Sequence, residues 1–212
     1  MASVIFVALF VMANAQDSRE TVNKEISKPM IRGGLVYKTY CVLCHGERGD
    51  GVAHTEKNYS GLDLAINAHP HEYYERVIRH GSHGAGMSST MPAWQYELSD
   101  EQINDVISYL VVVKDPVRRG EVIYKTNCIL CHGINADGKG RAAGLFSPAP
   151  ADLTQSTRDD DYKREIIHKG SKAMDRSAGM PSWEDKLTDT EIQDLIDYLR
   201  TVLVVPSANQ SK

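Results

Sequence analysis

The sequence predicts an all-α protein made of two tandem helical domains. Three observations lead to this fold class: the chain repeats itself after about 90 residues, each repeat places apolar residues at helical spacing, and strand signals are weak. The best strand candidate, residues 109–113, is β-branched but continues the apolar stripe of a helix and has no alternating polar partner. We therefore expect helices throughout.

The internal repeat sets the domain boundaries. When the two halves are aligned on their cysteines, Gly33 and Tyr37 match Gly120 and Tyr124. Further along, Met91-Pro92-Ala93-Trp94 matches Met180-Pro181-Ser182-Trp183, and a tyrosine follows the methionine by 18 residues in both copies. We assign residues 16–115 to the first domain and 116–212 to the second. The linker Lys114-Asp115-Pro116 is short, so the domains should be neighbours.

The first helix of each domain is predicted to lead into a cysteine pair. It runs from about Met30 to Cys44, and its counterpart starts just after Pro116, a residue favoured at the first helical position, and ends near Cys131. Gly33 and Gly120 lie inside these helices, where a glycine costs about 1 kcal/mol relative to alanine. We expect another helix to cross closely at each glycine, namely the one that carries Tyr109 or Tyr198.

Two further helices follow in each domain. The second covers about residues 71–80 and 159–169, where Asp159-Asp160-Asp161 is typical of an acidic first turn. The third has the clearest start signal, because Ser99 with Gln102 and Thr188 with Glu191 form capping boxes ahead of apolar residues at helical spacing.

The most informative motif is CxxCH, which occurs as residues 41–45 and 128–132 and uses all four cysteines of the chain. It is the attachment signature of haem c: two thiols add to the porphyrin vinyl groups and the following histidine supplies an axial nitrogen. Zinc knuckles usually lie about 15–20 residues apart, whereas these pairs are 87 apart, and a thioredoxin-like dithiol would need a preceding strand. We therefore expect two covalently bound haem c groups, held by Cys41, Cys44, Cys128 and Cys131, with His45 and His132 on the iron.

The sixth iron ligand decides whether each haem is open to substrate or closed for electron transfer. Met91 and Met180 are the candidates, because they stand in the same MPxW context 46 and 48 residues after their haem histidines. The competing histidines, at positions 69, 71, 80, 83 and 168, have no such regular placement, and Met87 and Met174 lie outside the shared motif.

Both halves resemble class I cytochrome c domains over nearly all of residues 28–205, through a helix ending in CxxCHG, a middle helix, a MPxW-like loop and a final helix with Tyr-Leu. The whole is similar to dihaem cytochromes c of the c-four kind. The resemblance implies thioether bonds at the four cysteines, His/Met ligation at both irons, and a haem crevice or propionate contact for Tyr37, Tyr124, Trp94 and Trp183.

One departure from the family pattern concerns the backbone carbonyl that accepts a hydrogen bond from Nδ1 of the proximal histidine. The family commonly supplies it from a proline, and Pro148 or Pro150 fits in the second half. The first half has no proline between His45 and Pro70, so a carbonyl around residues 59–61 is expected to substitute. Because this hydrogen bond tunes ligand basicity, the two haems should differ in potential.

The N-terminal residues and the compartment form a separate prediction. Residues 4–12 are a short apolar run ending in Ala13-Asn14-Ala15, which fits a secretory signal peptide over residues 1–15, although no Lys or Arg precedes it. An uncleaved anchor is the alternative. No other run reaches 18 apolar residues, so we expect no transmembrane span in the mature chain and a periplasmic location.

Charge is divided unevenly between the halves and completes the functional prediction. Residues 16–115 carry 14 acidic and 10 basic side chains, whereas residues 116–212 carry 14 of each, and nothing indicates nucleic acid binding. We expect a dihaem electron carrier rather than an enzyme. It would exchange single electrons between a donor and an acceptor redox protein, and a membrane respiratory complex is one candidate partner. The alternatives are an electron-transfer subunit of a dehydrogenase or oxidase complex and a dihaem peroxidase-type enzyme.

Overall fold

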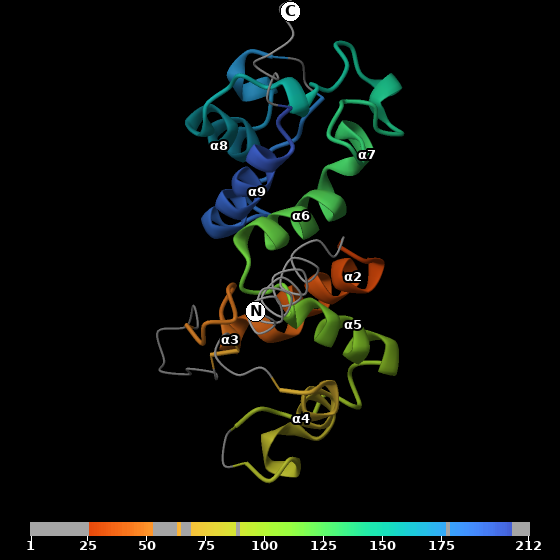
Figure 1. Cartoon of the computed structure of the whole chain (residues 1–212). Helices are drawn as coiled ribbons and strands as arrows, with labels where there is room; N and C mark the ends of the chain where they lie inside the picture. Colours follow the sequence, from red (N-terminus) through yellow and green to blue (C-terminus); the bar gives the residue numbers. More distant parts are fainter. Residues whose placement is uncertain (1–25, 53–62, 65–68, 88–89, 177–178, 205–212) are drawn as a thin grey trace, which may run out of the picture.

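The computed structural model describes residues 26–52, 63–64, 69–87, 90–176 and 179–204. No strand occurs among them, which confirms the all-α prediction. The first half contains α2 (Lys28–Val36), the π-helical turn η1 (Tyr37–Cys41), α3 (Val42–His45), α4 (His71–Gly84) and α5 (Asp100–Leu110). The second contains α6 (Pro116–Asn127), α7 (Ile129–His132), η2 (Ala143–Leu145), η3 (Leu153–Gln155), α8 (Asp160–Lys169), η4 (Lys172–Met174) and α9 (Asp189–Thr201). Figure 1 shows the two sets stacked one above the other.

The predicted helices are present, with differences near the cysteines and at one glycine. The helix expected over residues 30–44 is three pieces, because the backbone forms a π turn and then breaks at Cys41, whose φ is −109°. The same break falls at Cys128 in the second half. α4 runs to residue 84, but Gly81 inside it has a φ of 70°, so regular helix ends near the predicted residue 80. Both capping boxes are formed as predicted.

Each half is organised around one close helix crossing. A Cβ placed on Gly33 would lie 2.0 Å from the carbonyl oxygen of Asp105 in α5, and one on Gly120 would lie 1.9 Å from that of Asp194 in α9. In each case the Cβ of the predicted tyrosine, Tyr109 or Tyr198, lies at 2.9 Å. The prediction of a close crossing at both glycines is confirmed, and α2–α5 and α6–α9 are the most closely packed helix pairs of the described chain.

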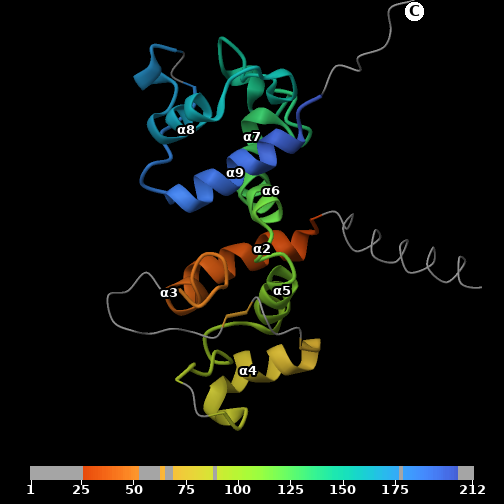
Figure 2. The ribbon, with the colours of Figure 1, turned by 60° about the vertical axis from the view of Figure 1, so that its left-hand side comes forward.

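The halves meet through α2 and α6, which lie side by side at the junction in both views (Figures 1 and 2). Here a Cβ on Gly34 would lie 2.8 Å from a methyl group of Val122. Lys38 in η1 reaches across to α9, where its Nζ lies 2.7 Å from a carboxylate oxygen of Glu191, and it also donates to the carbonyl of Lys186 at 2.9 Å. The segment that carries the first cysteine pair is thus tied to the last helix of the other half.

None of the helices in the described ranges is both long and apolar enough to cross a lipid bilayer. The predicted signal peptide, residues 1–15, lies outside the described residues.

Candidate functional site

A cavity of 520 Å³ in the first half gathers most of the residues predicted for its haem. Cys41, Cys44 and His45 reach it from η1 and α3, and Met91 reaches it from the loop between α4 and α5. The rest of its lining is largely apolar or aromatic and includes Tyr37, Tyr40, Leu64, Ile78, Trp94, Val106 and Leu110. Its volume lies within the range of about 300–1,000 Å³ typical of ligand and cofactor pockets.

The donor set of this cavity fits a haem c. Two thiols, one imidazole and one thioether converge from separate elements on a mostly apolar space, and these are the groups that attach and ligate such a cofactor. In the second half, Cys128, Met180 and Trp183 pack in the same way against a buried cluster around Tyr124, as Cys41, Met91 and Trp94 pack against the first cluster.

The first cysteine of each pair is partly buried. Burial, with a smaller contribution from the neighbouring cysteine, raises the pKa of Cys41 to about 12 and the pKa of Cys128 to about 12. Both groups are therefore thiols at neutral pH. The thiol is the form that is consumed when a thioether bond forms.

A buried tyrosine fixes the chain directly after the histidine of each CxxCH motif. The hydroxyl of Tyr37 donates to the carbonyl of Gly46 at 2.8 Å, and the hydroxyl of Tyr124 donates to that of Gly133 at 2.6 Å. Each glycine has a positive φ, 73° and 81°, so the chain turns sharply there. Burial raises the pKa of both tyrosines. Tyr37 also lines the cavity, but both hydroxyls are committed to the backbone turn.

The loops that carry Met91 and Met180 are each held by a serine that sequence reasoning missed. The Oγ of Ser82 accepts from the backbone N–H of Met91 at 3.1 Å, and the Oγ of Ser171 accepts from that of Met180 at 3.0 Å. The serine N–H donates back to the methionine carbonyl at 3.1 Å in both halves. A Gly-Ser pair at the same distance before each methionine was the available sequence signal.

The hydrogen bond of His132 corrects one prediction. Its Nδ1 lies 3.2 Å from the carbonyl oxygen of Ala151, so the partner is the residue after Pro150 rather than Pro148 or Pro150. The Pro150 carbonyl instead packs against the turn at Gly138, where a Cβ would lie 2.5 Å from it. Burial lowers the pKa of His132, and the bond to Ala151 partly offsets this. For His45, the carbonyl expected around residues 59–61 lies outside the described residues.

The two tryptophans are placed alike but have different neighbours. The backbone N–H of Trp94 donates to the carbonyl of Ile78 at 2.9 Å, and that of Trp183 donates to the carbonyl of Ile167 at 3.1 Å. The ring of Tyr40 meets Trp94 edge-on at 5.5 Å, whereas the Nζ of Lys186 lies 5.5 Å from the ring centre of Trp183.

A repeated ion pair, also missed from the sequence, locks each helix crossing. Arg119 donates from Nε and Nη2 to the two carboxylate oxygens of Asp194 at 2.7 and 2.8 Å, and both side chains are 4% exposed. Arg32 pairs with Asp105 in the same two-pronged manner at 2.6 and 2.8 Å. A bidentate pair fixes helix orientation as well as distance, and it does so beside the glycine contact in both halves.

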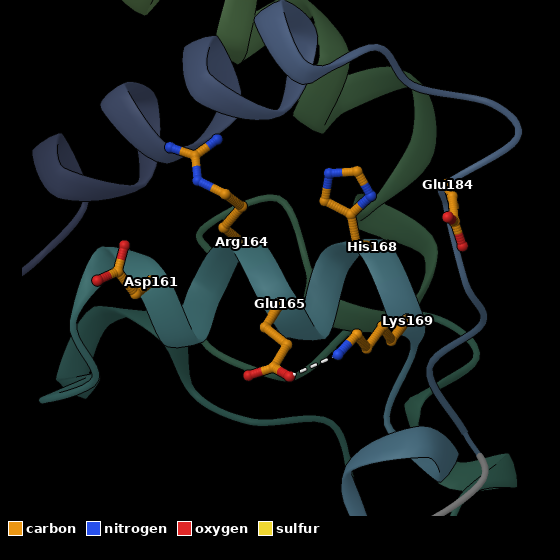
Figure 3. Close-up of a pocket in the computed structure, with 6 residues that line it drawn as sticks. All are labelled: Asp161, Arg164, Glu165, His168, Lys169 and Glu184. Atoms are coloured by element: carbon orange, nitrogen blue, oxygen red, sulfur yellow. Dashed lines mark hydrogen bonds and ion pairs between the residues drawn. The ribbon is translucent and has the colours of Figure 1, made fainter.

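The competing histidines have varied surroundings. His168 pairs with Asp189 at 2.9 Å, as Arg79 pairs with Asp100 at 2.7 Å in the first half. With Arg164 and Lys169 it lines a charged surface hollow of 370 Å³ on α8 that contains none of the predicted haem residues (Figure 3). In contrast, His69 and Met87, which sequence reasoning set aside as ligands, both line the first cavity.

The fold and the repeated Cys/His/Met arrangement define the class of this protein as a tandem cytochrome c. More narrowly, the chain belongs to the family described as cytochrome c oxidase, cbb3-type, subunit III, whose model matches residues 29–110 and again residues 115–199. The resemblance to tandem cytochrome c domains is thereby confirmed, and the family is one of electron-transfer proteins that carry covalent haem c.

Two relatives and one solved structure illustrate the likeness. The chain is 24% identical to the cbb3-type cytochrome c oxidase subunit FixP of Sinorhizobium medicae over 88% of its length and 67% of the relative. It is 25% identical to subunit CcoP of Azospirillum brasilense over 85% of its length and 64% of the relative, so it spans about two thirds of these proteins. A chain of the reducing HAO-like protein complex of Kuenenia stuttgartiensis aligns over 85% of this chain and 98% of its own, with 22% identity and a TM-score of 0.37, too low to support an inference.

Proposed function

We propose that this chain transfers single electrons through two haem c groups, one in each half, each ligated by a histidine and a methionine. The observation that carries the proposal is the first cavity, which brings Cys41, Cys44, His45 and Met91 together on an apolar lining. The repeat of these residue types, and of the bonds around them, supports the same role for Cys128, Cys131, His132 and Met180.

The bound haem supplies the redox centre, whose iron changes between the ferric and ferrous states. The residues of the chain do the rest. The cysteines would attach the cofactor covalently, His45 and His132 would ligate its iron, and Met91 and Met180, on loops held by Ser82 and Ser171, would complete the ligand set. A closed sixth position favours electron transfer over substrate chemistry, and a thioether ligand favours the ferrous state, so both potentials should be relatively high.

We further propose that the chain works in the periplasm and passes its electrons to a membrane oxidase. The family match and relatives that are themselves oxidase subunits favour this role over that of a freely diffusing shuttle. Co-purification from solubilised membranes separates the two: a subunit elutes with the oxidase at high salt, whereas a shuttle elutes alone.

Replacement of the methionine ligands tests the ligation. Met91→Ala and Met180→Ala should each open one haem, lower its potential and remove about half of the sulfur-to-iron charge-transfer absorption of the oxidised protein. Met174→Ala, outside the shared motif, is the control and should change neither the potentials nor this absorption. The assignment is wrong if the native protein lacks that absorption or if neither substitution alters it.

A reductive titration of the native protein distinguishes an electron carrier from an enzyme of the dihaem peroxidase type. Such an enzyme needs a haem that is open or that loses its ligand on partial reduction. Both haems of the native protein should instead stay six-coordinate and low-spin through a reductive titration, with no turnover of hydrogen peroxide. A spin change at half reduction would favour the peroxidase.

A further inference from the structure

We propose that the haem of the second half has the higher reduction potential, so that electrons enter at the first half and leave from the second. This inference rests on the proposed function and adds a direction to it. It follows from three pairs of equivalent positions beside the crevice aromatic residues, where the first half carries His69, Met87 and Glu97 and the second carries Arg158, Arg176 and Lys186.

The backbone establishes that these positions are equivalent. α4 and α8 begin two residues after His69 and Arg158, respectively. The N–H of Met87 donates to the carbonyl of Ser82 at 2.8 Å, and that of Arg176 donates to the carbonyl of Ser171 at 3.0 Å. The third pair follows the tryptophans by three residues in both halves. Its N–H groups donate to the tryptophan carbonyls, at 3.0 Å for Glu97 and 2.9 Å for Lys186.

In the first half, two of these positions line the cavity without a permanent cation. The imidazole of His69 stacks on the ring of Tyr73 with centres 4.0 Å apart, and the Tyr73 hydroxyl contacts the sulfur of Met87 at 3.5 Å. All three residues line the cavity. A side chain at the position of His69 or Met87 therefore lies next to the proposed haem. The third position holds the anion Glu97.

In the second half, the same tyrosine is flanked by two guanidinium groups. The Cζ of Arg158 lies 4.7 Å from the ring centre of Tyr162, and the Cζ of Arg176 lies 5.6 Å from it. Within the described chain, neither guanidinium has a carboxylate within ion-pair distance. The third position holds the cation Lys186, above Trp183. Three positive charges thus replace one negative charge and two neutral side chains. An opposing difference is smaller: the first half has Arg76, whose Cζ lies 6.0 Å from the ring centre of Tyr73, where α8 has Glu165. With both counted, the net charge of these positions rises from 0 in the first half to +2 in the second.

The sign of the effect follows from Coulomb's law. Oxidation adds a positive charge to the iron site, nearby cations oppose that change, and the potential therefore rises. Arg158 and Arg176 are exposed, so water and salt weaken each contribution and the difference should shrink as ionic strength increases. The net charge of the halves, 14 acidic against 10 basic residues in 16–115 and equal numbers in 116–212, acts in the same direction.

A spectroelectrochemical titration of the complete two-haem protein tests the order. We would record it at pH 8, where histidine is largely uncharged, and at low ionic strength, and expect two reduction steps. Arg158→His with Arg176→Met copies the first half into the second and should lower the higher step while leaving the lower one in place. Glu97→Lys should raise the lower step only. Arg158→Lys with Arg176→Lys is the matched control, because it keeps the charge and should leave both steps unmoved.

Each outcome separates this inference from the proposed function. Two low-spin His/Met haems with a single shared potential, or a double variant that lowers the lower step, would overturn the proposed direction and leave the electron-transfer function standing. If the charge-preserving control shifts the higher step as far as the double variant does, packing rather than charge sets the potential. Loss of the sulfur-to-iron absorption in the native protein would contradict the ligation itself.

Discussion

Replacing Gly120 by alanine tests the helix crossing that shapes the second half. An ideal Cβ at this position would lie 1.9 Å from the carbonyl oxygen of Asp194 and 2.9 Å from the Cβ of Tyr198. Ordinary contacts between such atoms are roughly 3.5–4 Å. To relieve the clash, α6 and α9 must therefore move apart by more than about 1 Å. Neither neighbour can give way alone, because one atom is backbone and the other is the root of a buried side chain.

The expected loss is the difference between two opposing effects. Alanine is better than glycine inside a helix by about 1 kcal/mol, whereas overpacking a tight contact costs typically 1–3 kcal/mol and occasionally more. A clash with backbone lies at the upper end, and the shift also loosens the bidentate Arg119–Asp194 pair. We expect a net loss of about 2–3 kcal/mol in the free energy of unfolding of this half.

Urea unfolding of the haem-loaded protein, followed by helical circular dichroism, measures this loss. With a slope of about 1–3 kcal/mol per molar urea, the midpoint of the second half should fall by about 0.7–3 M. Gly144→Ala is the matched control, because a Cβ there meets nothing within 4 Å. Equal midpoints for the two variants would refute the reasoning.

Three further predictions follow from the same contacts. Arg119→Leu leaves a buried carboxylate without its partner and should cost about 3–5 kcal/mol in urea unfolding, whereas Arg32→Leu should cost less because that side chain is 47% exposed. Ser171→Ala removes the hydroxyl that holds the second methionine loop; it should cost about 1 kcal/mol and weaken the sulfur-to-iron absorption of one haem only, and an unchanged spectrum would argue against the positioning role. Hydrogen bonds from Arg200 lower the pKa of the Asp160 carboxyl, so the stability they contribute is present at neutral pH and is lost as pH falls below about 4; Arg200→Gln should lower the urea midpoint at pH 7 more than at pH 3, and equal losses would contradict the assignment.

A direct contact ties the two halves of the chain together. Lys38, three residues before the first haem cysteine, is bound to Glu191 and to the Lys186 carbonyl in the other half. The segment that carries one predicted haem therefore touches the helix and loop that enclose the other. Such a fixed contact suits electron exchange between the two centres.

Local patterns in the sequence were sufficient to predict the helices and the repeat, and they supplied the candidate residues of both sites. CxxCH brings two thiols and an imidazole together within one short segment, a capping box is complete within four residues, and an apolar stripe repeats with each helical turn. Even the helix crossings could be predicted, because a glycine that costs stability inside a helix needs a compensating close contact. None of these inferences required knowledge of a distant contact.

Apart from the helix crossings, the tertiary structure decided which residues far apart in the chain meet. It selected Ala151 rather than a proline as the partner of His132, 19 residues away, and it joined Arg119 to Asp194 across 75 residues. It also placed His69 and Met87 at the first cavity, while Arg158 and Arg176 flank the matching tyrosine in the second half. Hydrogen bonds act over about 3 Å and charge interactions over about 10 Å in space, so folding determines which distant groups come within their reach.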